Sequence, residues 1–297
     1  MIDLHCHLLP GIDDGPQTME ASLQLARALQ EDGIQHVVCT PHVFPGRHDN
    51  TSTSIAAHVS AMTEALREAG IPLTLSWAGE VRLMPEVLGL LARNELPFLG
   101  VSPAGQRFML LEMPDGQIPV GTDRFVAKLL QARVTPILAH PERNRAVMED
   151  YRRIGPLVAM GCGLQLTASS LTGEFGPRVQ AVAQRLLDKS WVQAVASDAH
   201  NLGGRRPRMS AASDWLSQHY GQTAAMRLTL LGPASLSRQP EAKLPEAGPA
   251  DSRTAAAAPL LDEEPMLDGR VLVAADRVDV PVAFERTAAA QPDKALP

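Results

Sequence analysis

The strongest constraint on the fold is the alternation of short β-rich runs with helical segments through the first 238 residues. The β-rich runs cover residues 2–7, 35–42, 73–82, 107–114, 134–141, 162–168 and 191–200. Strands that alternate with helices form a parallel sheet covered by helices. Seven such units without a glycine-rich dinucleotide motif predict a closed or nearly closed α/β barrel.

The intervening segments carry helix signals. Thr18 is expected to cap the first helix, with Met19, Leu23, Ala26 and Leu29 on its buried face and Gly33 at its end. The second helix has apolar residues at helical spacing and ends at Gly70: Ile55, Val59, Met62 and Leu66. Later helices are expected over residues 85–93, 123–132, 145–160 and 177–190.

Composition changes near residue 239. Residues 239–297 are rich in Ala and Pro and contain one aromatic residue, Phe284. Such a segment buries too little apolar area to offset its ordering entropy. We therefore expect a single folded domain over residues 1–238 and a low-complexity, disordered tail over residues 239–297.

Charge and cysteine content exclude several classes of protein. The net charge of −6 argues against a nucleic-acid binder that works through a basic surface. The apolar runs are shorter than the roughly 18 residues of a membrane span, and no signal peptide is visible. Three cysteines, an odd number, suit a reducing compartment. We expect a cytoplasmic protein without membrane insertion or a nucleic-acid partner.

Imidazoles and carboxylates stand at the carboxyl ends of six of the seven runs, and the sixth run ends in Gln165, Thr167 and Ser169. The candidate ligands are His5, His7, His42, Glu80, Glu112, His140, Asp198 and His200. In a βα barrel these ends converge on one face, where active sites are built. A set of this kind predicts a metal centre.

The number and type of these groups narrow the chemistry. Imidazole and carboxylate ligands without thiolate suit Mn²⁺, Fe²⁺ or Zn²⁺, and so many ligands indicate two or three ions. Clustered ions activate a hydroxide and bind a phosphoryl or acyl oxygen. Arg143 and Arg205 lie on loops over the same face and favour a phosphate dianion. The alternative is that they pair with nearby acids such as Glu142.

Several motifs in order carry a family resemblance. They are MIDLHCHLLPGIDDGP at residues 1–16, TPH at 40–42, GEVRL at 79–83, LLEMP at 110–114, AHPERN at 139–144 and SDAHN at 197–201. Through about residue 238 the chain resembles the PHP (polymerase and histidinol phosphatase) superfamily. Within it, the chain is similar to bacterial tyrosine-protein phosphatases of the CpsB/YwqE type.

This resemblance implies a distorted seven-stranded TIM-like (β/α)7 barrel, the PHP fold, with a trinuclear and typically manganese-dependent site. Each implied ion has its own ligands: His5, His7, Glu80 and Asp198 for the first, Glu80, Glu112 and His140 for the second, and Asp14, His42 and His200 for the third. Asp13 is the less favoured alternative to Asp14. Arg143 and Arg205 would bind the phosphate of a tyrosine-phosphorylated protein, expected to be a bacterial tyrosine autokinase of capsule or exopolysaccharide production.

Other functions remain to be weighed. A cysteine-dependent phosphatase needs Cys-x₅-Arg, but Ile12, Pro45 and Ala168 stand six residues after the three cysteines. An amidohydrolase often uses a carboxylated lysine, and no lysine ends a run. A PHP phosphoesterase acting on a small phosphomonoester such as histidinol phosphate would keep the same ions, so it is the alternative function. A scaffold without activity would have lost ligands, and none is lost.

Overall fold

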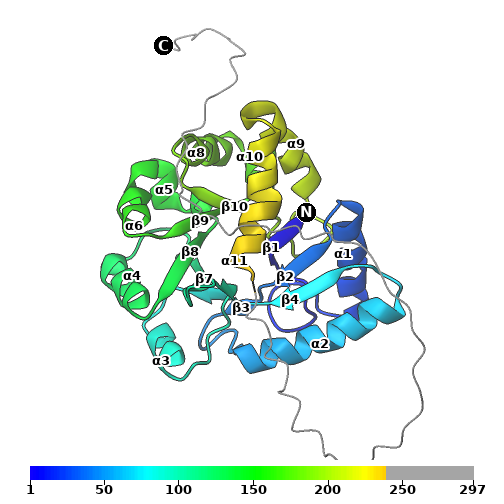
Figure 1. Ribbon diagram of the computed structural model, residues 1–297. Helices are drawn as coiled ribbons and strands as arrows, with labels where there is room; N and C mark the ends of the chain where they lie inside the picture. Colours follow the sequence, from blue (N-terminus) through cyan, green and yellow to red (C-terminus); the bar gives the residue numbers. More distant parts are fainter. Residues whose placement is uncertain (239–297) are drawn as a thin grey trace, which may run out of the picture. The chain divides into compact units, whose positions relative to one another are not determined.

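The strands form a mostly parallel barrel in the computed structural model, which describes residues 1–238 (Figure 1). The expected tail, residues 239–297, lies outside the described residues. The strands are β1 (Ile2–Cys6), β2 (His36–Cys39), β3 (His42–Val43), β4 (Thr74–Trp77), β5 (Glu80–Arg82), β6 (Gly100–Val101), β7 (Arg107–Glu112), β8 (Val134–Ala139), β9 (Gly163–Thr167) and β10 (Val192–Ala196). Each of the seven predicted runs therefore contains a strand, and the predicted α/β barrel class is confirmed.

Helices surround the barrel (Figure 1). The α-helices are α1 (Met19–Glu31), α2 (Ser52–Glu68), α3 (Glu86–Ala92), α4 (Thr122–Gln131), α5 (Arg145–Glu149), α6 (Gly155–Ala159), α7 (Ala168–Thr172), α8 (Pro177–Asp188), α9 (Met209–Tyr220), α10 (Gln222–Met226) and α11 (Gly232–Leu236). Two 3₁₀ turns are η1 (Pro141–Arg143) and η2 (Tyr151–Ile154), and a π-helical turn is η3 (Arg227–Leu231).

The second and third predicted runs are each split into two strands. Residues 35–42 form β2 and β3, and residues 73–82 form β4 and β5. The pairing keeps one register across the break, with Cys39 opposite Trp77 and His42 opposite Glu80. Pro41 lies at the break between β2 and β3 and has no N–H to donate to a neighbouring strand. Gly79 lies at the break between β4 and β5, where a Cβ would come within 2.5 Å of the Pro97 ring. The break therefore redirects both runs without changing their order.

The barrel closes between its first and last strands. One sheet runs β1-β2-β4 and the other β10-β9-β8-β7-β5-β3, with β6 antiparallel to β7. Between β1 and β10, Asp198 N–H donates to the His5 carbonyl at 2.8 Å, and the buried carboxylate of Asp3 accepts the Ser197 N–H at 2.8 Å and its hydroxyl. The Asp3 side chain thus supplies hydrogen bonds that join β1 to the end of β10.

The helix predictions hold with two corrections. Thr18 caps α1, and α2 buries the four residues predicted for it. In α1 the fully buried face is Ser22, Leu25, Ala26 and Leu29, while Met19 and Leu23 are only partly buried. Because Ser22 is polar, the apolar pattern of the sequence does not indicate that it belongs to the buried face. The helix expected over residues 145–160 is three short pieces, because Asp150 caps a new turn and Pro156 starts another.

The barrel interior has a small apolar core of its own. It is formed by Leu4, Val38, Ala78, Leu99, Leu110, Ile137, Ala139, Ala194, Ala196 and Leu236. Leu236 comes from α11, and Arg238 accepts the Val101 N–H at 2.8 Å, beside the first residues of β7. The chain therefore plugs the amino end of the barrel and leaves the carboxyl end for the polar side chains. No helix within residues 1–238 is long and apolar enough to span a bilayer.

Candidate metal centre

The predicted strand-end residues converge at the carboxyl end of the barrel. His42, Glu80 and Glu112 lie in β3, β5 and β7, while His7, His140, Asp198 and His200 follow the ends of their strands. His5 lies within β1, one alternation before His7. Asp14 comes from the loop between β1 and α1. All are buried or nearly so except Asp14, whose side chain is 47% exposed.

Three overlapping groups of these residues have ligand atoms within 4.8 Å of one another and could each hold a metal ion. They are His7, Asp14, His42 and His200; His5, His7 and Glu80; and His42, Glu80 and Glu112. In the first group, Asp14 Oδ1 lies 3.3 Å from His42 Nε2 and 3.2 Å from His200 Nε2. The grouping of Asp14 with the two imidazoles matches what the family resemblance implies.

Glu80 is the shared carboxylate of the site. Its Oε2 lies 3.3 Å from the Nε2 atoms of His5 and His7 and 3.1 Å from His42 Nδ1. Its Oε1 lies 2.8 Å from His140 Nε2. Glu112 approaches His42 at 3.9 Å, whereas His140 contacts Glu80 and stacks on the His5 ring, with 5.6 Å between the ring centres. A carboxylate in this position can bridge two ions.

Two hydrogen bonds fix the orientation of the β1 imidazoles. His7 Nδ1 lies 2.6 Å from Asp13 Oδ2, and His5 Nδ1 lies 2.9 Å from Gln165 Oε1. Because both acceptors are oxygens, each Nδ1 carries a proton, and in the neutral ring Nε2 is then an acceptor. The two Nε2 atoms face each other at 3.2 Å. A contact at this distance requires either a proton or a metal ion shared by the two nitrogens, so the arrangement can accept a metal in place of a proton.

The fit is supported by polar atoms that satisfy no hydrogen bond. Within residues 1–238, the buried atoms of the site that lack a hydrogen bond of good geometry are His42 Nδ1, Glu112 Oε2, Asp198 Oδ1, His200 Nε2 and Arg205 Nε. Three of them, His42 Nδ1, His200 Nε2 and Glu112 Oε2, have an oppositely charged group within 3.2 Å but only as an ion pair. Buried polar groups are nearly always satisfied, and four of these five atoms are of the type that ligates metals. The site therefore has unused coordination capacity in one small volume.

The pKa values of the carboxylates follow from burial and from their neighbours. Burial raises the pKa of Glu112, and the Glu80 charge raises it further. Burial alone would also raise the pKa of Glu80, but His5 and hydrogen bonds from His140 and His42 hold it well below its usual range. Two carboxylates forced together in this way are the arrangement that divalent cations stabilise.

Burial, reinforced by the His7 charge, lowers the pKa of His200 to about 4. Its imidazole is therefore neutral at pH 7, which is the form that ligates metal. Two of the predicted residues also have left-handed backbone: φ is +31° at His140 and +52° at Asp198. Such conformations are costly for residues other than glycine and cluster at functional sites.

The two arginines predicted to bind phosphate both contact Asp198. Arg143 NH1 donates to Asp198 Oδ2, and Arg205 NH2 donates to the same oxygen at 2.6 Å. The alternative expectation, pairing of the arginines with a nearby acid, is therefore met, although the acid is Asp198 and not Glu142. Glu142 is fully buried and accepts the Thr167 N–H at 2.9 Å and the Ser170 hydroxyl at 2.6 Å. It anchors the turn that carries Arg143.

Sequence reasoning missed two supporting residues, Asp13 and Gln165. Asp13 was weighed only as a substitute ligand for Asp14, yet its carboxylate also accepts N–H groups from Gly15 at 2.9 Å and His42 at 3.1 Å. Gln165 belongs to β9, the strand expected to lack a strong ligand. The available signal was a long polar side chain in an otherwise buried strand.

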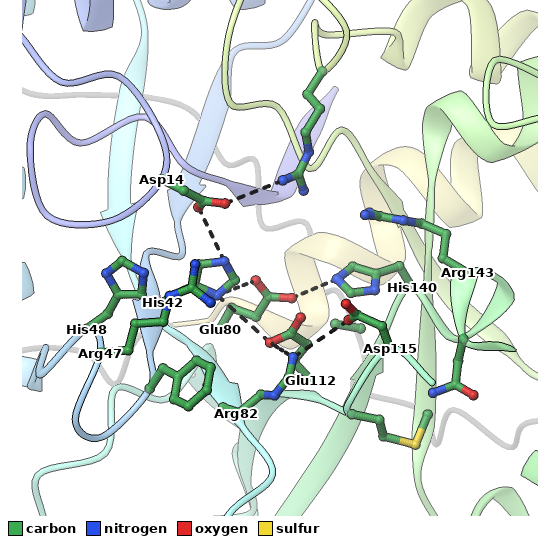
Figure 2. Close-up of a pocket in the computed structure, with 15 residues that line it drawn as sticks. Asp14, His42, Arg47, His48, Glu80, Arg82, Glu112, Asp115, His140 and Arg143 are labelled. Carbon is green, nitrogen blue, oxygen red and sulfur yellow. Dashed lines mark hydrogen bonds and ion pairs between the residues drawn. The ribbon is translucent and has the colours of Figure 1, made fainter. Parts of the chain in front are cut away.

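A cavity of about 410 Å³ opens above the cluster, and Figure 2 shows its lining. Asp14, His42, Glu80, Glu112, His140, Arg143 and Arg205 line it, together with a wall from the β3–α2 loop that includes Phe44, Arg47 and His48. This volume is within the range of small-molecule sites.

The three cysteines are unpaired and buried, so none is accessible to a substrate as a nucleophile. Burial raises the pKa of Cys162 to about 12 and raises those of Cys6 and Cys39 still further. None of these thiols is the activated thiolate that a nucleophilic cysteine needs.

Fold and site together define an α/β barrel with an imidazole–carboxylate centre under a cavity of about 410 Å³, and comparison with known proteins agrees. The model of the capsular polysaccharide synthesis family CpsB/CapC matches residues 1–238. The chain belongs to this family.

Individual relatives span almost the same region. The tyrosine-protein phosphatase YwqE of Bacillus subtilis is 32% identical over 245 residues, covering 81% of this chain and 95% of YwqE. The tyrosine-protein phosphatase CpsB of Streptococcus pneumoniae is 29% identical, covering 80% and 98%. A crystal structure from work on YwqE and CpsB as metal-dependent tyrosine phosphatases matches with a TM-score of 0.74 at 32% identity, covering 81% of this chain and 96% of that one.

Proposed function

We propose that this chain is a metal-dependent protein-tyrosine phosphatase whose substrate is a tyrosine-phosphorylated protein, specifically a bacterial tyrosine autokinase of capsule or exopolysaccharide production. The observation that carries the proposal is the pair of opposed His5 and His7 Nε2 atoms, 3.2 Å apart, beside the shared carboxylate of Glu80. Membership of the CpsB/CapC family supports the substrate class.

We further propose a site for two or three Mn²⁺ ions, with Fe²⁺ or Zn²⁺ as substitutes, in a barrel of the PHP type. The proposed ligands are His5, His7, Asp14, His42, Glu80, Glu112, His140, Asp198 and His200. When bound, the ions would supply the Lewis acidity for attack of water on phosphorus. This donor set of imidazoles and carboxylates without thiolate suits those metals.

The chain's own contribution to the reaction is to bind and orient the phosphate. Arg143 and Arg205 each use one N–H group on Asp198 and have further donors, including the unsatisfied Nε of Arg205. A guanidinium presents five N–H donors in a fixed fork, so both arginines can hold Asp198 and a phosphoryl oxygen together. Their charge is placed where the transferred group spreads its negative charge.

We propose that residues 1–238 form the complete catalytic domain and that the protein works in the cytoplasm. Every proposed site residue lies before residue 206, and α11 completes the barrel at Leu236. Three unpaired cysteines suit a reducing compartment.

The test of the function is phosphate release from three substrates: a phosphotyrosine peptide, a phosphoserine peptide and histidinol phosphate. We expect turnover of the phosphotyrosine peptide, loss of it after chelation and its return when Mn²⁺ is added. Faster turnover of histidinol phosphate than of the peptide would replace the proposal with a small-molecule phosphoesterase. Turnover that resists chelation would refute the role of the metal.

Two classes of variant separate metal binding from phosphate binding. Arg143→Ala and Arg205→Ala should keep their metal content but lose about 10²–10³ in rate, the usual cost of one donor to a developing oxyanion. Glu80→Ala and His42→Ala should lose metal together with activity. Metal content by mass spectrometry beside turnover distinguishes them, and arginine variants with wild-type turnover would contradict the assignment.

A further inference from the structure

Four arginines line the cavity, and three of them already engage a carboxylate. Arg82 NH1 lies 2.9 Å from Glu112 Oε2, and Arg143 and Arg205 both hold Asp198. Arg47 is different. It is exposed at the cavity wall and has no carboxylate partner in the described part of the chain. Its charge is therefore available to a group that enters from outside.

Arg47 is held in place by a tight hairpin. Phe44 and His48 exchange two backbone hydrogen bonds, at 3.0 and 2.8 Å, and the Arg47 N–H donates to the Phe44 carbonyl at 2.9 Å. Gly46 has φ +82°, a conformation that side chains disfavour. The nearby Asp49 is occupied because its Oδ1 accepts the Gly46 N–H at 2.7 Å. The hairpin presents Arg47 without neutralising it.

The ring of Phe44 lies close to two of the four guanidiniums. The Arg82 guanidinium lies 5.3 Å from the centre of the Phe44 ring and the Arg47 guanidinium 5.9 Å from it. Arg82 continues to Glu112 in the proposed metal site, whereas Arg47 lies on the side of the cavity opposite Arg143 (Figure 2). Phe44 and Arg47 therefore form one wall of the cavity, and Arg143 belongs to the opposite wall.

We propose that Arg47 forms a subsite for an acidic side chain next to the phosphotyrosine of the substrate, with the phenyl ring of that phosphotyrosine against Phe44. This inference rests on the proposed phosphatase function. In this arrangement the phosphate is at Arg143 and Arg205, the phenyl ring is at Phe44, and a neighbouring residue of the substrate is at Arg47, all of which line the same cavity. Arg47 is thus a specificity-determining residue.

The experiment uses the metal-loaded full chain and three phosphotyrosine peptides that differ only in the residues flanking the phosphotyrosine: Glu, Gln or Lys on both sides. A fourth substrate, 4-nitrophenyl phosphate, has no flanking residues. We expect kcat/KM to be about three- to fivefold higher with Glu than with Gln, the size of an exposed ion pair, and lowest with Lys. This preference should shrink in 0.5 M salt, because screening weakens exposed charge pairs.

Variants assign the preference to Arg47. Arg47→Ala should abolish it and Arg47→Glu should reverse it in favour of the Lys peptide, a gain that a misfolded protein cannot produce. Arg47→Lys should retain part of it. The matched control is Arg124→Glu on the exposed face of α4, which should leave the preference unchanged. Arg124→Glu should also leave turnover of 4-nitrophenyl phosphate within about twofold of the wild type.

The outcomes distinguish the subsite from the function beneath it. If 4-nitrophenyl phosphate and all peptides resist hydrolysis, the phosphatase proposal fails and the subsite fails with it. If they are hydrolysed without charge preference, or if Arg47→Ala retains the preference, only the subsite is refuted.

Discussion

Asp13 offers the sharpest test of how the proposed metal centre is built. Its carboxylate lies 2.6 Å from His7 Nδ1, and both side chains are buried. It raises the electron density of the imidazole and fixes its tautomer, a role whose loss typically costs 10- to 100-fold in metal affinity. Asp13→Asn keeps the size and an oxygen acceptor but removes the charge. We expect metal binding about 10- to 100-fold weaker, or about 1.4–2.7 kcal/mol.

The pH dependence makes this prediction more specific. Burial alone would lower the pKa of His7, but Asp13 and Glu80 raise it to about 9. Below pH 9 the metal must therefore displace a proton from His7, and its affinity should rise with pH up to about 9. Asp13→Asn lowers the pKa of His7, so protons compete less with the metal in this variant. The loss of metal affinity relative to the wild type should therefore be largest at pH 9 and smaller at pH 7.

The assay is competition against a fluorescent chelator in anaerobic buffer at pH 7, 8 and 9, with Mn²⁺ as the probe. Asp123→Asn, an exposed substitution on α4, is the control and should match the wild type. Equal affinity of Asp13→Asn and wild type at pH 9, or a deficit that grows toward pH 7, would show that Asp13 does not act through His7.

Three further predictions concern the rest of the chain. Phosphatase activity should survive treatment with a thiol-alkylating reagent under native conditions, because all three thiols are buried; stoichiometric inactivation with metal still bound would contradict this. A chain ending at Arg238 should retain turnover of 4-nitrophenyl phosphate, and a soluble but inactive product would place the domain boundary later. Since the pKa of Cys162 is raised to about 12, the unfolded thiol ionises first above pH 9. Between pH 8 and pH 10, wild type should therefore lose about 1.4 kcal/mol more unfolding free energy than Cys162→Ala in urea titrations; parallel curves would refute it.

Much of the site could be predicted because strand alternation and strand ends are local properties of a sequence. His5 and His7 share one face of β1, and a parallel barrel brings the carboxyl ends of all its strands together. That reasoning needs no knowledge of side-chain packing. It therefore identified which strand ends meet before any distance was known.

What the sequence could not show depends on contacts between distant segments. Asp13 and Asp14 have the same chemistry, and the sequence does not show that Asp13 accepts from His7 Nδ1 while Asp14 faces the imidazole Nε2 of His42. The engagement of Arg143 by Asp198, 55 residues away, is a tertiary contact of the same kind. The break in the helix expected over residues 145–160 is a local feature. It was missed because the apolar periodicity predicts one continuous helix, although Asp150 is a residue that can cap a new turn.

The seam between β1 and β10 also sets the order in which this protein can be made. Asp3 and Ser197 are 194 residues apart in sequence, and Leu236 must still arrive to fill the barrel end. Contacts of such long range are slow to form, because loop closure must precede the gain. His5 and His7 are synthesised first, but they can contact Asp198 and His200 only after nearly the whole domain has been synthesised. Assembly of the complete ligand set is therefore expected only after the whole of residues 1–236 has been synthesised.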